Sequence, residues 1–171
     1  MEAITCLMTR RSVRSYQDRQ VDEQALQTIL EAGTYAPSAK NFQAAKIVVI
    51  QDPEVIRDIS GMNAKVLGKA IDPFFGAPTV IVVFSNTQRR TFVEDGTLVL
   101  GNIMLAAHAL GLSTCWVHRA REVFESPEGK AYMKQWGLGE EYVGIGNCAL
   151  GYASAPLPAA KPRKKDYIIR I

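Results

Sequence analysis

The sequence predicts one layered domain of the α/β or α+β class, with a small sheet covered by helices on both sides. The chain has 171 residues, which suits a single domain 1–171 with a substantial core. Its apolar fraction of 47% and charged fraction of 22% are those of an ordinary globular protein. Helical patterns come first along the chain, and strands then alternate with helices, without a repeat or a linker.

The first half of the chain predicts three helices and one strand. In order, we expect a short helix over residues 2–9, a helix over 23–35, a strand over 44–51 and a helix that starts at 53. Asp22 is the expected N-cap of the second helix, which ends at a loop containing Pro37. The strand is rich in β-branched residues, and the third helix has Asp52 as its cap and Pro53 in its first turn. The pattern over 62–77 is ambiguous.

Strands and helices alternate in the second half. We expect a strand over 79–85, a helix over 94–110, a strand over 113–118, a helix that starts at 127 and a strand over 141–152. Ser126 is the expected cap of the helix that starts at 127, and residues 166–171 are expected to form a last short β-like segment. The first of these strands is almost wholly apolar, as strands buried on both faces are. The helix over 94–110, which is followed by Gly111 as a C-cap, is apolar nearly all round. A helix of this kind predicts an interface between two copies of the chain.

Composition excludes several classes of protein. The net charge of +3 is too small to indicate a nucleic-acid partner. No apolar stretch approaches the ~20 residues that span a bilayer, and we expect no membrane association and no signal peptide. Cys6, Cys115 and Cys148 lie in apolar contexts without metal-ligand spacing. We therefore expect buried free thiols, no metal site and a cytoplasmic location.

A basic cluster stands near the start of the chain. Arg10, Arg11 and Arg14 surround Ser12 and Ser15 within a few positions. Most such clusters are solvated turns, but guanidiniums alternating with hydroxyls also suit a phosphate group. A second cationic segment, with Lys161 and Arg163, stands at the far end of the chain. From these residues alone, a basic turn and a phosphate site are equally supported.

A polar loop follows the second expected helix. Pro37 fixes its backbone, and Ser38, Asn41 and Gln43 offer hydrogen bonds. All of these residue types favour turns, so a simple helix-terminating turn is one interpretation. An amide side chain at the end of the loop would also suit the edge of a heterocycle.

The remaining motifs favour structural interpretations. The glycines of residues 144–151 begin like a dinucleotide-binding loop, but the third comes two places late and no helix follows. They instead predict a strand against which another backbone or a ligand lies close. His108 is expected to be a core or interface residue, and His118 ends a strand. No pattern for a nucleophile–base pair is present.

The whole chain resembles the nitroreductase family of FMN-dependent oxidoreductases. The motifs that carry the resemblance occur in the family's order: RRSVRSY, AGTYAPSAKNFQAAKIVVI, FFGAPTVIVVF, DGTLVLGNIMLAAHALGLSTCWV and KPRK. The resemblance implies a three-layer α+β fold with a mixed, mostly antiparallel sheet. It also implies an intertwined homodimer, in which the segment from about 155 to 171 reaches onto the partner chain.

The resemblance further implies a set of FMN-binding residues. These are Arg10, Arg11, Ser12, Arg14, Pro37, Ser38, Asn41, Trp116, Val117, Lys161 and Arg163. Arg10 would hold the phosphate with help from Arg14, and Arg11 would lie against the ribityl chain or the ring. The 37–41 loop would reach the flavin from the other chain or line the edge of its ring, and the late cationic pair would close on the phosphate. A positive charge near flavin N1 could come from Arg11, or from Lys65 or Lys69.

The implied activity is electron transfer from NAD(P)H, by a ping-pong mechanism, to a flat acceptor such as a nitroaromatic or a quinone. The flavin would do the chemistry, so no catalytic side chain is expected. The family's common QPW sequence is absent, because Ala44 and Ala45 follow Gln43. That difference favours an alternative: a flavin-handling protein or specialised reductase without general nitroreductase activity. A nucleic-acid-binding domain is disfavoured, since no aromatic residues are interleaved with the basic ones.

Overall fold

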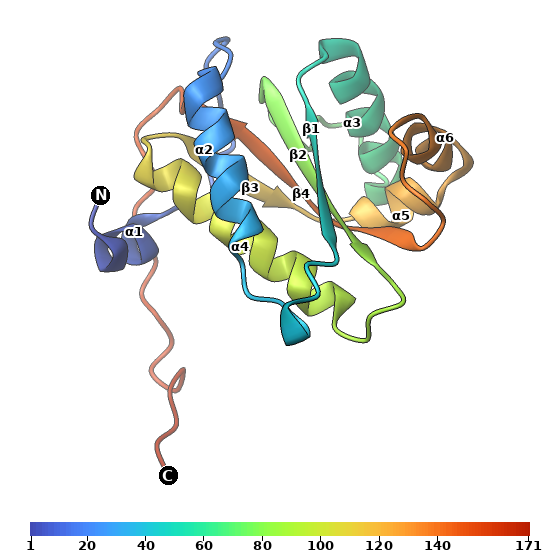
Figure 1. Ribbon diagram of the computed structural model, residues 1–171. Coiled ribbons are helices and arrows are strands. Elements are labelled where there is room, and N and C mark those ends of the chain that lie inside the picture. Colours follow the sequence, from blue (N-terminus) through green and yellow to red (C-terminus); the bar gives the residue numbers. More distant parts are fainter.

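A four-stranded antiparallel sheet forms the middle layer of the computed structural model, which describes residues 1–171 (Figure 1). Its spatial order is β1-β2-β4-β3. The strands are β1 (Ala45–Ile50), β2 (Thr79–Asn86), β3 (Ser113–Val117) and β4 (Tyr142–Gly151). The helices are α1 (Ala3–Thr9), α2 (Glu23–Thr34), α3 (Pro53–Leu67), α4 (Phe92–Ala109), α5 (Ala120–Glu125) and α6 (Pro127–Gln135), with a 3₁₀ turn at Ala39–Asn41.

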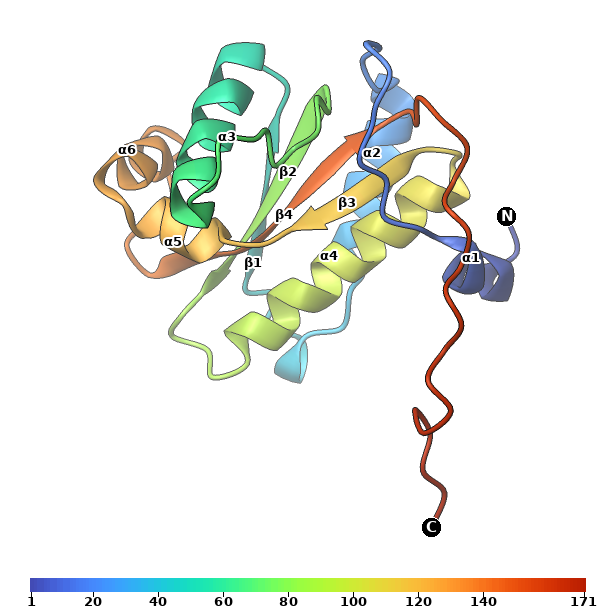
Figure 2. The same ribbon diagram turned by 180° about the vertical axis from the view of Figure 1, so that it is seen from behind.

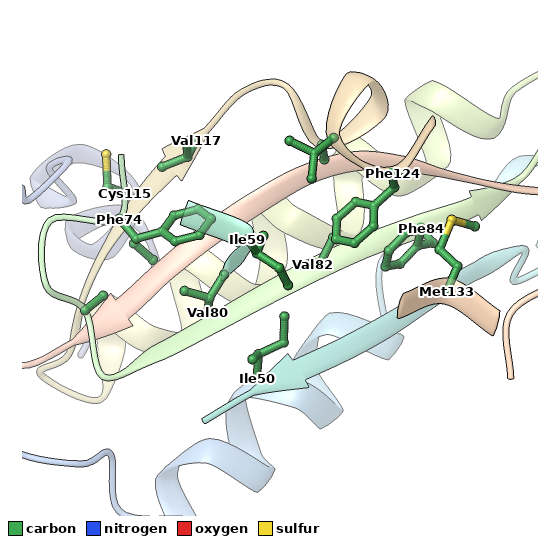
Figure 3. Packing of buried hydrophobic residues seen from close by; sticks show 14 residues of the cluster. Ile50, Ile59, Phe74, Val80, Val82, Phe84, Cys115, Val117, Phe124 and Met133 are labelled. Atoms are coloured by element: carbon green, nitrogen blue, oxygen red, sulfur yellow. The ribbon is translucent and has the colours of Figure 1, made fainter. Parts of the chain in front are cut away.

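Helices cover both faces of this sheet, which confirms the three-layer α+β fold. Helices α2 and α4 lie on one face, and α3, α5 and α6 lie on the other (Figures 1 and 2). On the second face, Ile59 of α3, Phe124 of α5 and Met133 of α6 pack against Val82 and Phe84 of β2 (Figure 3). Strand β2 is buried on both sides because both layers contact it, as its unbroken apolar sequence predicts.

Three helices begin at the capping residues that the sequence predicts. The Asp22 carboxylate accepts from the N–H of Ala25 at 3.1 Å, and that of Asp52 accepts from the N–H of Glu54 at 2.8 Å. The Ser126 hydroxyl accepts from the N–H of Gly129 at 3.1 Å. Each side chain supplies an acceptor to a helix N-terminus, which has no acceptor of its own.

The glycines of β4 allow close approach, as predicted. A Cβ on Gly144 would lie 2.6 Å from the carbonyl oxygen of Ala120, and one on Gly146 would lie 2.5 Å from the indole nitrogen of Trp116. The ring of Tyr16 crosses Gly151 in the same way, at 3.0 Å. The motif is therefore a packing device within the sheet.

The structure corrects several details of the predicted elements. All four strands pair antiparallel, and the parallel contact of Ser12 with Thr114 is an isolated bridge, so the sheet itself is not mixed. Helix α4 begins at Phe92, two residues earlier than expected. Helix α5 was not predicted, because six residues are too few for a helical periodicity to emerge. Residues 166–171 form no strand within this chain, because no strand lies beside them to pair with.

Candidate functional site

The basic segment lies along the free edge of β3. Ser12 bridges to Thr114, and the Val13 N–H donates to the carbonyl of Thr114 at 3.0 Å. Further along, the Gln17 N–H donates to the carbonyl of Tyr152 at 2.9 Å. Because β3 is an edge strand, the contacts with Thr114 pair part of its exposed backbone, and the Tyr152 bond ties the same segment to the residue after β4, so that the position of the arginine cluster is fixed.

Two guanidinium groups of this cluster carry buried donors without partners. Arg10 Nη1 and Arg11 Nε are both shielded from solvent and make no hydrogen bond. The Nη1 of Arg11 donates to the carbonyls of Met8 at 2.9 Å and Arg10 at 2.7 Å, at the end of α1. A buried unsatisfied donor costs about 1–3 kcal/mol. The two free donors therefore fit the oxygens of a phosphate group, which would satisfy them.

A cavity of about 270 Å³ opens beside the cluster. It is lined by Ser12, Val13, Arg14, Ser15, Ala155, Pro156 and Pro158. The first residues after β4 thus form one wall and the basic segment forms the other. The Arg14 guanidinium lies 5.9 Å from the centre of the Phe75 ring, which supports that side chain at the edge of the site.

His108 lies in the positive electrostatic field of the arginine cluster. It is buried near the end of α4, and its Nε2 lies 2.8 Å from the Thr9 hydroxyl oxygen. Burial lowers the pKa of His108, and the charges of Arg10 and Arg11 lower it further. His108 is buried within one chain, which agrees with the prediction of a core or interface residue.

The polar loop after α2 is strained. Lys40, Asn41 and Gln43 have φ values of 51°, 55° and 50°, in the left-handed region. Such residues cost of the order of 1–3 kcal/mol each and persist only where surrounding contacts hold them. The Ser38 hydroxyl accepts from the Gln43 N–H at 3.0 Å, and the Gln43 amide donates to Asn41 Oδ1 at 3.1 Å. The Ser38 hydroxyl hydrogen and the Asn41 amide hydrogens are left free to donate, while Pro37 is exposed at the start of the loop.

One chain does not bring this loop to the basic cluster. The loop contacts Asp95 in the first turn of α4, whereas Thr9, next to the cluster, contacts His108 in the last turn. Between these two residues the helix rises about 20 Å, at about 1.5 Å per residue. Within one chain, the loop and the cluster therefore lie at opposite ends of α4.

The second cationic segment also lies apart from the cluster. Lys161 and Arg163 are exposed in a tail that extends away from the three layers (Figures 1 and 2). Arg163 donates from Nε and Nη2 to the carbonyl of Lys161, at 3.2 and 2.8 Å. The convergence of both cationic segments on one phosphate therefore stays a prediction.

Trp116 and Val117 of β3 were both predicted to contact FMN, but only Trp116 has an exposed side chain. Trp116 is 44% exposed, and its ring meets that of His118 edge-on with 5.4 Å between centres. The side chain of Val117 is buried in the core on the other face of the sheet, in the cluster that also contains Phe124. Val117 could contact a ligand on the Trp116 face only through its backbone.

A buried polar network after β3 was not predicted. Asn63 of α3 and Asn147 of β4 both donate to the carbonyl of His118, at 2.9 and 3.3 Å. Arg119 has a φ of 75° and donates from Nε to Asn63 Oδ1 at 3.0 Å. Together these bonds hold a strained turn at the end of β3. The one sequence feature that could have indicated this network is Asn147, a polar residue within the apolar sequence of β4.

The fold and these groups define the class of site. A partly buried cationic cluster at one end of an edge strand suits a phosphate, and an exposed tryptophan and donor-rich loops suit a flat polar ring. No helix of the structure has the length and apolarity needed to cross a bilayer. No three His, Cys, Asp or Glu side chains gather as metal ligands.

Comparison with known proteins identifies the family. Residues 7–73 and 65–152 match the nitroreductase family, and the chain belongs to it. An Archaeoglobus fulgidus protein with the provisional name NADH dehydrogenase/NAD(P)H nitroreductase is 31% identical over 157 residues, which cover 88% of this chain and 85% of that protein. A Bacillus subtilis FMN reductase [NAD(P)H] is 41% identical over 136 residues, covering 66% of this chain and 52% of that protein. A crystal structure of a Bacteroides fragilis nitroreductase with bound FMN is similar with a TM-score of 0.91 at 27% identity, covering 100% of this chain and 99% of that one.

Proposed function

We propose that this protein is an FMN-dependent oxidoreductase that takes electrons from NAD(P)H and passes them to a flat acceptor such as a nitroaromatic or a quinone. The observation that carries the proposal is the pair of buried, unpaired donors on Arg10 and Arg11. Family membership and the FMN-bound B. fragilis relative support the same cofactor.

The cluster would hold the phosphate. Arg10 Nη1 would donate to one phosphate oxygen, with the Ser12 hydroxyl and the exposed Arg14 guanidinium beside it. Arg11 is less free, since its Nη1 already donates to carbonyls at the end of α1, which leaves Nε and Nη2 for the ribityl chain or the ring. Each charge-assisted hydrogen bond contributes about 1.5–3 kcal/mol, and several together would retain the cofactor through turnover.

Strand β3 would then lead from the phosphate to the ring. Thr114 pairs with the basic segment, and His118 follows the other end of the strand. At about 3.3 Å per residue these positions are about 13 Å apart, a separation that suits an elongated cofactor lying along the strand. Trp116 would face the ring system, and Val117 would contribute backbone groups.

A homodimer would complete the site. Apolar side chains of α1 and α4 are exposed on one chain: Ile4 60%, Leu7 58%, Met8 71%, Val93 40% and Leu98 45%. Ile168 and Ile169 in the tail are 76% and 82% exposed. Burial of these side chains against a second copy would bring the 36–43 loop of one chain and the tail cations to the cluster of the other.

When bound, FMN supplies hydride acceptance from NAD(P)H and electron transfer to the second substrate. The protein's own tasks are to hold the phosphate, keep one ring face open and place donors at the ring edge. We propose that NAD(P)H and the acceptor occupy the same open face in turn. Initial rates measured against both substrates test this order: parallel double-reciprocal lines are expected, and intersecting lines would contradict it.

A second candidate is a flavin-handling protein or specialised reductase without general nitroreductase activity. Ala44 and Ala45 support it, because they stand where the family commonly has Pro and Trp, and smaller side chains there would change the shape of the substrate pocket. The two candidates differ in turnover. FMN-loaded protein that oxidises neither NADH nor NADPH with a nitroaromatic or a quinone would favour the second.

A further inference from the structure

Asp95 is the one acidic side chain buried in this protein. It is 4% exposed and lies in the first turn of α4, the most apolar helix of the chain. A buried carboxylate is costly unless it is hydrogen-bonded, so its partners indicate what it is for. We propose that Asp95 is a positioning residue that holds the strained 36–43 loop in its flavin-binding conformation. This inference rests on the proposed function.

The carboxylate joins the loop to the helix. Asp95 Oδ1 accepts from the backbone N–H of Ala39 at 3.1 Å, and Oδ2 accepts from the Thr91 hydroxyl at 3.1 Å. The Ala39 N–H makes no other hydrogen bond, so the loop depends on Asp95 to satisfy it. The Thr91 hydroxyl in turn orients the carboxylate.

The loop needs such an anchor because its backbone is unfavourable on its own. Lys40, Asn41 and Gln43 are all left-handed without being glycine. A second contact comes from the Arg89 guanidinium, which lies 3.9 Å from the centre of the Phe42 ring. Both anchors belong to residues 89–95, so the start of α4 and the loop form one unit.

This unit fixes the donors that the loop presents. Because Ser38 Oγ and Asn41 Oδ1 both accept from Gln43, the positions of the two side chains are fixed, and their hydroxyl and amide hydrogens are left free to donate. Loss of the Asp95 contact would let the backbone at Ala39 relax toward ordinary φ values, and these donors would lose their common orientation. Asp95 would thus act on the flavin only through the loop.

The test compares Asp95→Leu, which removes both acceptors at similar size, with Asp95→Asn, which keeps an oxygen for the Ala39 N–H. Two readouts are taken on the full chain: the rate of tryptic cleavage after the exposed Lys40, and the FMN dissociation constant from flavin fluorescence. Asp95→Leu should speed cleavage about tenfold, because the loop opens locally, and weaken FMN binding about tenfold. Asp95→Asn should stay close to wild type in both. Cleavage within the exposed 161–165 segment is the internal reference and should not change.

Thr91→Val keeps the carboxylate and removes only its hydroxyl donor, which makes it the second variant if Asp95→Leu does not fold. It should raise cleavage after Lys40 about two- to threefold. Unchanged cleavage in the folded variants, or Asp95→Asn behaving like Asp95→Leu, would overturn the inference. Faster cleavage with unchanged FMN affinity would overturn the link to the flavin. Wild-type protein that binds no FMN but shows the same cleavage pattern would refute the proposed function and leave the anchor standing.

Discussion

Removal of the Arg10 guanidinium should weaken FMN binding while leaving the fold intact. In the chain alone, Arg10 Nη1 is buried without a partner, so Arg10→Ala removes no protein hydrogen bond from that atom. The free energy of unfolding of the flavin-free protein should therefore change by less than about 1 kcal/mol. With FMN, one or two charge-assisted bonds of about 1.5–3 kcal/mol are lost, which raises the dissociation constant about 10- to 150-fold or more. The FMN dissociation constant of Arg10→Lys should lie between those of the wild type and Arg10→Ala, because lysine keeps the charge but lacks the paired donors of the guanidinium.

Flavin fluorescence titration and thermal unfolding, carried out on the same samples, measure both quantities. Arg121→Ala is the matched control: it removes the same charge from α5, where the guanidinium lies 5.6 Å from the Phe92 ring centre. It should not alter FMN affinity. An Arg10→Ala dissociation constant within twofold of wild type would refute the phosphate assignment. So would equal losses in Arg10→Ala and Arg121→Ala, because net charge rather than position would then explain the effect.

Three other changes have defined outcomes. Deletion of residues 155–171, which are exposed and lie outside the layers, should preserve the circular dichroism spectrum but yield monomers with poor FMN retention; a flavin-loaded dimer by light scattering would contradict this. Burial and nearby arginines lower the pKa of His108, so its contribution to stability is fully present above about pH 6.5 and is lost as the pH falls below that value. His108→Asn should therefore make the free energy of unfolding in urea less dependent on pH below about pH 6.5. Gly129→Ala places a Cβ 2.1 Å from the Val123 carbonyl oxygen and should lower the free energy of unfolding by about 2–4 kcal/mol. Gly61→Ala, on an open part of α3, should raise it by about 0.5–1 kcal/mol. Equal melting temperatures of the two variants would refute the packing of α5 against α6.

Most of the fold could be predicted because local signals agree with the tertiary structure. Asp22, Asp52 and Ser126 cap the helices that their sequence context predicts, and the unbroken apolar run of β2 is buried on both faces. Helix α5 escaped prediction because its position depends on packing against Gly144 rather than on its own six residues. The tail is expected to reach onto a partner chain, and that expectation stays a prediction, because pairing with another chain is not a local property of residues 155–171.

The residues of the site likewise fall into those with a local sequence signal and those without one. Arg10 and Ser38 could be selected from the sequence because clustered charge and turn chemistry leave a local pattern. Asp95 could not, since it stands among apolar residues and finds its partner, Ala39, far away in the sequence. The Asn63 and Asn147 network is equally non-local, because three separate elements converge on one peptide. The apolar helix α4 predicts contact between two copies of the chain, but no pattern within one chain specifies how the 36–43 loop and the arginine cluster are placed relative to each other.

The central claim is that the protein holds FMN and reduces it with NAD(P)H. The visible absorbance spectrum of the purified protein, supplied with FMN and freed of unbound cofactor, tests this most directly. We expect flavin bands at close to one equivalent per chain, bleaching when NADH or NADPH is added without oxygen, and recovery on addition of a quinone. A protein that stays colourless after incubation with FMN would contradict the account.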